Sequence, residues 1–152
     1  MYKKGVITGH PKIVSGPSGE LDAFTFGQHD LLTLGSTGVD TDKTWTVDTY
    51  IKVPVDKGCQ TARGNPCPWM TLTRGKSGDH QVIVRRSDGQ VGSYENLHRP
   101  GKSARGFVSA GWKLTDLADG WHRLTVSSIC SDGACKTRKT MYYIDKKVVG
   151  QR

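Results

Sequence analysis

The alternation of apolar and polar residues with a period of two is the feature that most constrains how this chain can fold. Residues 44–53 read TWTVDTYIKV, so that Trp45 and every second residue after it form a mostly apolar face. Asp48 and Lys52 fall on the opposite, polar face. Residues 121–128 read WHRLTVSS and place a leucine and a valine two residues apart. Both patterns predict strands that are buried on one side.

Shorter segments with strand character follow along the chain, and turns rich in Gly and Asp separate them. The segments are Leu21–Phe26, Leu31–Leu34, Trp69–Arg74, Gln81–Arg86, Val91–Tyr94, Phe107–Ser109 and Thr140–Asp145. Short strands at this spacing are typical of an all-β sandwich or barrel. Residues 114–118 alone suggest a helical turn. We therefore predict an all-β fold that forms one domain over residues 1–152.

The charge of the chain favours anionic partners. Lys and Arg number 22 against 14 Asp and Glu, which gives a net charge of +8. Such a field attracts nucleic acid, acidic glycans, anionic lipid or an acidic protein. The sequence has no recognition helix, no zinc finger and no aromatic-plus-basic RNA-binding motif, so nucleic acid is the partner it favours least. No apolar run approaches the ~20 residues of a membrane span, and the first residues contain no signal peptide.

The four cysteines form two local pairs, Cys59 with Cys67 and Cys130 with Cys135. Each pair brackets a turn-rich stretch, and the second closes a turn between two strand-like segments. Four cysteines allow three connectivities, of which we favour the two local disulfides. Free thiols and a zinc site remain alternatives, although the spacings are not those of common zinc knuckles. Disulfides would imply an oxidising compartment, so we expect an extracellular, cell-surface or other oxidising location.

Several segments together resemble a laminin-G-like domain. The opening LDAFTFG, then DLLTLG at 30–35 and WTVDTYIK at 45–52, are similar to the first strands of that family. Further on, DGWHRLTV at 119–126 and TMYYIDKKVVG at 140–150 resemble its late hairpin. The resemblance covers residues 21–150. It implies the concanavalin A-like jelly-roll sandwich of two antiparallel sheets, a fold that hosts lectins, glycanases and adhesion modules.

Two departures from this family concern the end of the chain. The usual Asp-Gly turn reads Asp145-Lys146, which puts Lys where a positive φ favours Gly. Family members also continue with one or two further strands after the final Val-Gly, whereas this chain stops at Arg152. Either residues 6–7 or 12–14 fill that slot, or the chain is a fragment, or a partner supplies the strand. We expect other polypeptide to cover the C-terminal sheet edge.

The sequence contains no catalytic pattern that fits this fold. Glycanases place two carboxylates on one strand about 5–5.5 Å apart, but the chain has only two glutamates, Glu20 and Glu95, in no such pattern. The stretch 106–111, GFVSAG, lacks the spacing of a nucleophile elbow. His122 lies in the inward phase of its strand, where a hydrogen-bonded structural histidine is the more common reading. We therefore expect a protein that is not an enzyme.

Glycan binding requires aromatic side chains for stacking and Arg or Lys for acidic groups. Candidates by residue type are Trp69, Arg85, Arg86, Tyr94, Arg99, Arg105 and Trp112, whereas Trp45 and Trp121 are assigned to the core. The alternative is that Trp69 and Trp112 only pack at a sandwich edge. Calcium is the one cofactor that the resemblance suggests, with weak candidate ligands at Asp22, Asp30, Asp40 and Asp42.

These observations predict a recognition module without catalytic activity. Its expected ligand is a glycan, and the net charge favours sulfated or uronate-bearing chains. The alternative is an accessory structural subunit that docks in a larger assembly through its open sheet edge.

Overall fold

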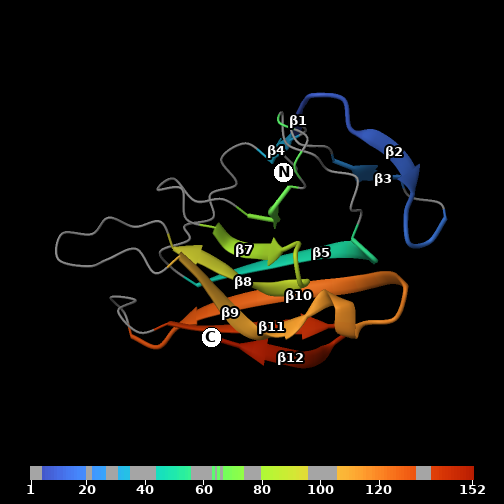
Figure 1. Cartoon of the computed structure of the whole chain (residues 1–152). Helices are drawn as coiled ribbons and strands as arrows, with labels where there is room; N and C mark the ends of the chain where they lie inside the picture. The colour runs from blue at the N-terminus through green and yellow to red at the C-terminus, as the bar shows by residue number, and fades with distance from the viewer. Residues whose placement is uncertain are drawn as a thin grey trace. The chain divides into compact units, whose positions relative to one another are not determined.

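The fold is all-β, with antiparallel sheets throughout (Figure 1). The computed structural model describes residues 5–19, 22–26, 31–34, 44–55, 63, 65, 67–73, 80–95, 106–132 and 138–152. The chain divides into two compact units, residues 1–39 with 56–67 and residues 40–55 with 68–152. Their behaviour as one domain, which the sequence suggests, stays a prediction.

The first unit contains two short antiparallel pairs. Strand β1 (Gly5–Thr8) pairs with β4 (Leu31–Leu34), and β2 (Lys12–Ser15) pairs with β3 (Asp22–Thr25). A turn closed by the amide of Gly19 on the carbonyl of Gly16, at 3.2 Å, follows β2. Among the described strands β12 pairs with β11 alone, and residues 6–7 and 12–14 pair with β4 and β3, so the structure does not show the alternative in which these residues pair beside the last strand.

The second unit contains two four-stranded antiparallel sheets. The first has the order β12-β11-β10-β5, and the second has the order β6-β7-β8-β9. Their bounds are β5 (Trp45–Val53), β6 (Trp69–Thr71), β7 (His80–Arg85), β8 (Gln90–Glu95), β9 (Gly106–Lys113), β10 (Gly120–Cys130), β11 (Arg138–Ile144) and β12 (Lys147–Gln151). A single turn of 3-10 helix, η1 (Leu114–Asp116), joins β9 to β10. No helix in the described segments is long and apolar enough to cross a membrane.

Both sheets of the second unit contribute to one hydrophobic core, as in a β-sandwich. The alternation predicted from the sequence accounts for this core, because every second residue of β5 and β10 faces inward and most of these residues are apolar. The core contains Trp45, Ile51, Val82, Val84, Val91, Ala110, Trp112, Leu114, Leu124, Val126, Tyr142 and Ile144. The rings of Trp112 and Tyr142 lie 6.5 Å apart within it. Burial raises the pKa of Tyr142 to about 12.

The last strand, β12, lies at a sheet edge and also against the opposite sheet. A Cβ on Gly150 would lie 2.4 Å from the carbonyl oxygen of Ala110 and 2.5 Å from Cδ1 of Trp112 in β9. Arg152 forms an ion pair with Glu95 and donates a hydrogen bond to Ser93, both in β8. These contacts join the two sheets at the C-terminal edge. The expectation that further polypeptide covers this edge stays a prediction.

The described cysteines are Cys67, which is buried, and Cys130, at the end of β10. Neither is a free thiol. Their expected partners, Cys59 and Cys135, lie outside the described residues, so the pairing stays a prediction.

Candidate ligand-binding face

The outward side of the β12-β11-β10-β5 sheet carries basic and aromatic side chains on neighbouring strands. We call this set the basic face and define it as Asp48, Tyr50, Lys52, Trp121, Arg123, Thr125, Lys139, Tyr143 and Lys146. Its members on β5, β10 and β11 alternate with the core residues of the same strands, while Lys146 belongs to the β11–β12 turn. Four of these side chains are basic and one, Asp48, is acidic. The face therefore has a positive potential.

Asp48 is held by Arg123 from the neighbouring strand. The Arg123 Nε donates to Oδ1 of Asp48 at 3.0 Å, and Nη2 donates to Oδ2 at 2.5 Å. The hydroxyl of Thr125, directly opposite Asp48 in the register, donates to Oδ1 at 2.9 Å. The hydrogen bond from Arg123 lowers the pKa of Asp48, so this carboxylate stays ionised. Its charge is balanced by the guanidinium that it orients.

An open depression of about 330 Å³ lies next to this ion pair. Its lining residues are Arg123, Thr125, Tyr143 and Lys146. Thr125 and Tyr143 are paired across β10 and β11, and Lys146 is in the turn that follows β11. A guanidinium, an ammonium group and a phenol ring around one depression provide ionic contacts, hydrogen bonds and a stacking surface for an anionic ligand.

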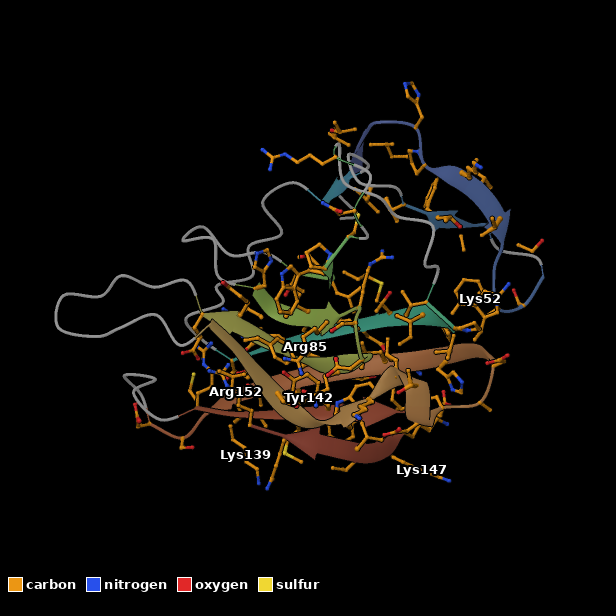
Figure 2. All side chains as sticks on the ribbon, in the orientation of Figure 1. Lys52, Arg85, Lys139, Tyr142, Lys147 and Arg152 are labelled. Carbon is orange, nitrogen blue, oxygen red and sulfur yellow. The ribbon has the colours of Figure 1, made fainter. Side chains whose placement is uncertain are left out.

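Two further aromatic residues extend the basic face beyond the depression. Tyr50, opposite Arg123 in the register, is 53% exposed. Lys52 places its Nζ 6.0 Å from the ring centroid of Trp121. Trp121 is half-buried on this outward face, so its assignment to the core was wrong: it shares the strand phase of Arg123, while Leu124 and Val126 face inward. Figure 2 shows where Lys52 and Lys139 leave the ribbon.

Close to this face, His122 is hydrogen-bonded through both ring nitrogens. Nδ1 lies 2.8 Å from Oδ2 of Asp145, and Nε2 lies 2.8 Å from the carbonyl oxygen of Ala118. The hydrogen bond to Asp145 raises the pKa of His122, and the bond to Ala118 raises it further. With both nitrogens engaged, His122 has the geometry of a structural histidine, as expected, and not that of a general base.

Three of the ligand residues expected from the sequence come together on the other sheet. The ring of Trp69 (β6) lies 5.6 Å from Tyr94 (β8) and 5.3 Å from Phe107 (β9), and His80 lies 6.3 Å from Tyr94. We call these four residues the aromatic cluster. The guanidinium of Arg85 stacks on Phe107 at 4.8 Å. A role in ligand binding for Trp69, Tyr94 and Arg85 stays a prediction.

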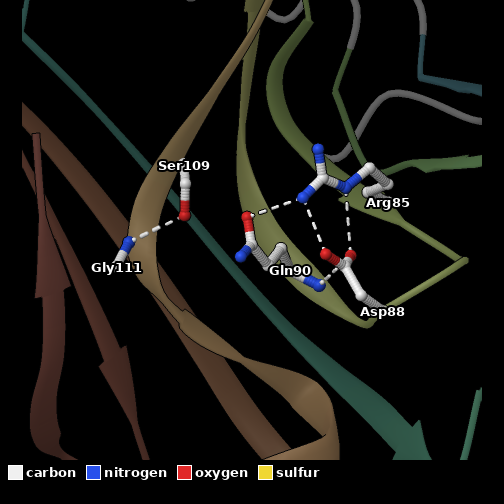
Figure 3. A network of polar contacts seen from close by, with 5 residues as sticks. All are labelled: Arg85, Asp88, Gln90, Ser109 and Gly111. Atoms are coloured by element: carbon white, nitrogen blue, oxygen red, sulfur yellow. Dashed lines mark hydrogen bonds and ion pairs between the residues drawn. The ribbon is translucent and has the colours of Figure 1, made fainter.

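The charge of Arg85 is already engaged within its own hairpin (Figure 3). Nε and Nη2 donate to the two carboxylate oxygens of Asp88 at 3.0 and 2.7 Å, and Nη2 also donates to Gln90 at 3.0 Å. The hydrogen bonds from Arg85, together with one from the backbone amide of Gln90, lower the pKa of Asp88 to about 2. Because Asp88 neutralises Arg85, an anionic ligand gains less from this arginine than from the lysines of the basic face.

The remaining predicted site residues have different positions. Trp112 is 7% exposed and packs in the core, so it offers no ring to a ligand, and its assignment as a binding residue was wrong. Arg86 is half-buried after β7 and takes part in an interaction of its own. Arg99 and Arg105 lie outside the described residues.

Calcium ligation is not established by the described chain. No group of three or more His, Cys, Asp or Glu residues that could hold a metal ion occurs in those segments. Asp30, Asp40 and Asp42 lie outside them, and only the strand position of Asp22 is described. Calcium binding at these residues stays a prediction.

Residue type alone does not single out the residues of the basic face, whereas strand phase does. The alternation in β5 already separates Asp48 and Lys52 from the core, and the same rule places Trp121 and Arg123 together. Comparison with known proteins does not identify a site, because no family model, no curated protein and no solved structure matches the chain.

Proposed function

We propose that this protein is a recognition module without catalytic activity that binds anionic glycans through the basic face. The observation that carries the proposal is the open depression between Arg123, Thr125, Tyr143 and Lys146. On the same face, Lys52 and the exposed ring of Tyr50 lie opposite Trp121 and Arg123 and add positive charge and a stacking surface, while Lys139 adds a charge four residues along β11 from Tyr143. Sulfate or carboxylate groups on a sugar chain complement this charge, and the pyranose faces complement the aromatic rings.

The chemistry of the basic face supports binding more than catalysis. Its single carboxylate, Asp48, is ionised and held by Arg123 and Thr125. Glycoside hydrolysis by the common route requires a second carboxyl group about 5–10 Å away as the acid or base partner. Asp145, beside Lys146, carries a further carboxylate, but its two oxygens are engaged by His122 and by the amide of Arg123. The resemblance to laminin-G-like domains agrees with a binding role but does not name a ligand.

The proposal is tested by measuring affinity for a panel of heparin fragments, uronate-only chains and neutral glycans, with single-stranded DNA as a competing polyanion. We expect saturable binding to the acidic glycans that weakens as salt rises, because exposed charges are screened over ~8–10 Å. The double variant Lys52→Gln/Lys146→Gln should bind at least tenfold more weakly.

The matched control is Lys12→Gln/Lys113→Gln, which removes the same charge from β2 and from β9. If the control variant loses as much affinity as the double variant, binding depends on net charge and the basic face is not the site. If single-stranded DNA binds more tightly than every glycan, the glycan proposal is overturned. Binding that a calcium chelator abolishes would move the site to aspartate ligands.

A second candidate function has its own supporting observation. Seven of the ten large apolar side chains that are exposed among the described residues belong to the first unit: Val6, Ile7, Ile13, Val14, Phe24, Phe26 and Leu32. Exposed apolar surface of this kind favours docking against another protein. An accessory subunit should self-associate or aggregate when isolated and should bind no glycan, which light scattering after gel filtration and the same glycan panel measure together.

A further inference from the structure

The position of Lys146 depends on an unusual turn. Ile144 pairs with Lys147, so Asp145 and Lys146 form a two-residue hairpin loop between β11 and β12. Both have positive φ, 48° for Asp145 and 71° for Lys146. Such turns favour Gly or Asn, and an L-residue such as Lys is strained there unless the surroundings hold it.

The side chain and backbone of Asp145 hold this turn on β10. The amide of Asp145 donates to the carbonyl of Arg123 at 3.0 Å, and the amide of Arg123 donates to Oδ1 of Asp145 at 2.9 Å. The second carboxylate oxygen, Oδ2, accepts from Nδ1 of His122 at 2.8 Å. Both oxygens of one carboxylate therefore connect the turn to two consecutive residues of β10.

His122 can make both of its hydrogen bonds only as the imidazolium. Its two partners, the Asp145 carboxylate and the Ala118 carbonyl, are acceptors, so both ring nitrogens must carry a proton. The neutral ring would turn a lone pair toward one of these oxygens. The side chain of His122 is 15% exposed, which leaves little water to compensate for the lost bond.

The elements around His122 carry several charged groups, of which one acts directly on its imidazole. Strand β5 places the uncharged Ile51 opposite it, and the segment before β10 carries Asp116 and Asp119. Asp145 is the carboxylate that acts on the imidazole, and Lys147 at the start of β12 acts on Asp145 in turn. On β10, the neighbouring Arg123 is paired with Asp48.

We propose that His122 is a positioning residue for the basic face: when protonated it holds Asp145 and so places Lys146 beside Arg123, and ligand binding weakens as His122 loses its proton. This inference rests on the proposed function for its effect on binding. The coupling between His122 and the Lys146 turn belongs to the free protein and can be measured there. The effect on binding is argued from the position of Lys146, which lines the depression together with Arg123.

The first experiment is an NMR titration of the full chain without ligand between pH 5 and 9. We expect the His122 ring signals and the backbone amide of Lys146 to shift with one common midpoint, above the ordinary value for histidine. Asp145→Asn keeps a residue that tolerates positive φ but removes the carboxylate, so it should lower the His122 midpoint and uncouple the Lys146 amide. His10→Gln is the control and should change neither. A Lys146 amide that does not follow His122 overturns the positioning role.

The second experiment measures the affinity of a heparin fragment over the same pH range. We expect affinity to fall about two- to tenfold across the His122 midpoint, the effect of about one hydrogen bond. The fall should disappear in Asp145→Asn, which uncouples the turn from His122, and stay in place in His10→Gln. Binding with no such step overturns the effect of His122 but leaves the proposed function standing. If the fragment binds at no pH while the Lys146 amide still follows His122, the proposed function is wrong and the positioning role is supported.

Discussion

Arg123 and Asp48 form an ion pair across neighbouring strands in the middle of the basic face, with Nε of the arginine 3.0 Å from Oδ1 of the aspartate. The two side chains are 45% and 40% exposed, so water screens the pair, and its contribution to stability is small. Its larger effect is on the ligand site. Asp48 fixes the guanidinium beside the depression and at the same time subtracts one positive charge from the face.

Asp48→Asn should therefore increase the affinity for an acidic glycan while lowering the melting temperature slightly. Removing a negative charge next to Arg123 favours an incoming anion, and we expect about two- to fivefold tighter binding at low salt. Calorimetric titration against a heparin fragment measures this change. Asp88→Asn makes the same charge change beside Arg85 on the other sheet and should leave the affinity almost unchanged. Equal gains in both variants would show that only net charge matters.

Gly150→Ala should destabilise the second unit by about 1–3 kcal/mol, the usual cost of forcing an added methyl group into a packed site. The new Cβ would lie 2.4 Å from the Ala110 carbonyl, which belongs to backbone and cannot move aside without displacing β9. Chemical denaturation measures the loss. Val148→Ala on the same strand is the control, because Val148 is 58% exposed and should change stability by less than about 0.5 kcal/mol. A wild-type-like Gly150→Ala would mean that β12 and β9 do not approach so closely.

Most strands could be predicted, because the alternation in the sequence reports directly on burial, but β1, β2 and β12 lie outside the segments predicted as strands. Residues 44–53 were expected as a strand and β5 is Trp45–Val53, while residues 31–34 match β4. The pairing of β1 with β4 could not be predicted in this way, because register depends on contacts between segments distant in sequence. The antiparallel sheets agree with a β-sandwich, and the jelly-roll connection remains an expectation from the resemblance.

The site could be predicted less well, because the type of a residue does not say which way it faces. Trp112 and Trp121 are both tryptophans at strand positions, yet Trp112 shares the phase of Ala110 and is buried, while Trp121 shares the phase of Arg123 and faces outward. Trp69, Tyr94 and Arg85 do come together. Lys146 could be singled out only as a turn residue, and its place beside Arg123 depends on the conformation of that turn.

Stability should depend on pH through His122 and Asp145. The hydrogen bond to Asp145 raises the folded-state pKa of His122, so its contribution is complete below pH about 6.5 and is lost as pH rises through the folded pKa. The hydrogen bond from His122 lowers the folded-state pKa of Asp145, so its contribution is present above pH 3.8 and is lost as pH falls through that pKa. Melting temperatures between pH 3 and 9 should therefore fall at both ends. Asp145→Asn should reduce the fall in melting temperature at both ends of this pH range. The control Asp119→Asn should leave the pH dependence unchanged. A pH dependence in Asp145→Asn equal to that of the wild type would contradict the pairing of His122 with Asp145.

Lys146→Gly should separate stability from binding at one position. Lys146 has φ of 71°, where Gly avoids the clash of a Cβ, so the variant should be more stable by about 1 kcal/mol. The same change removes an ammonium group from the depression, so affinity for an acidic glycan should fall severalfold.

Lys147→Gly is the matched control, because Lys147 begins β12 and glycine in a strand lowers stability. Chemical denaturation measures the stability of each variant, and calorimetric titration measures its affinity for an acidic glycan. A Lys146→Gly protein that is more stable but binds as well as the wild type would remove Lys146 from the site, and one that is less stable would contradict the positive φ of the turn.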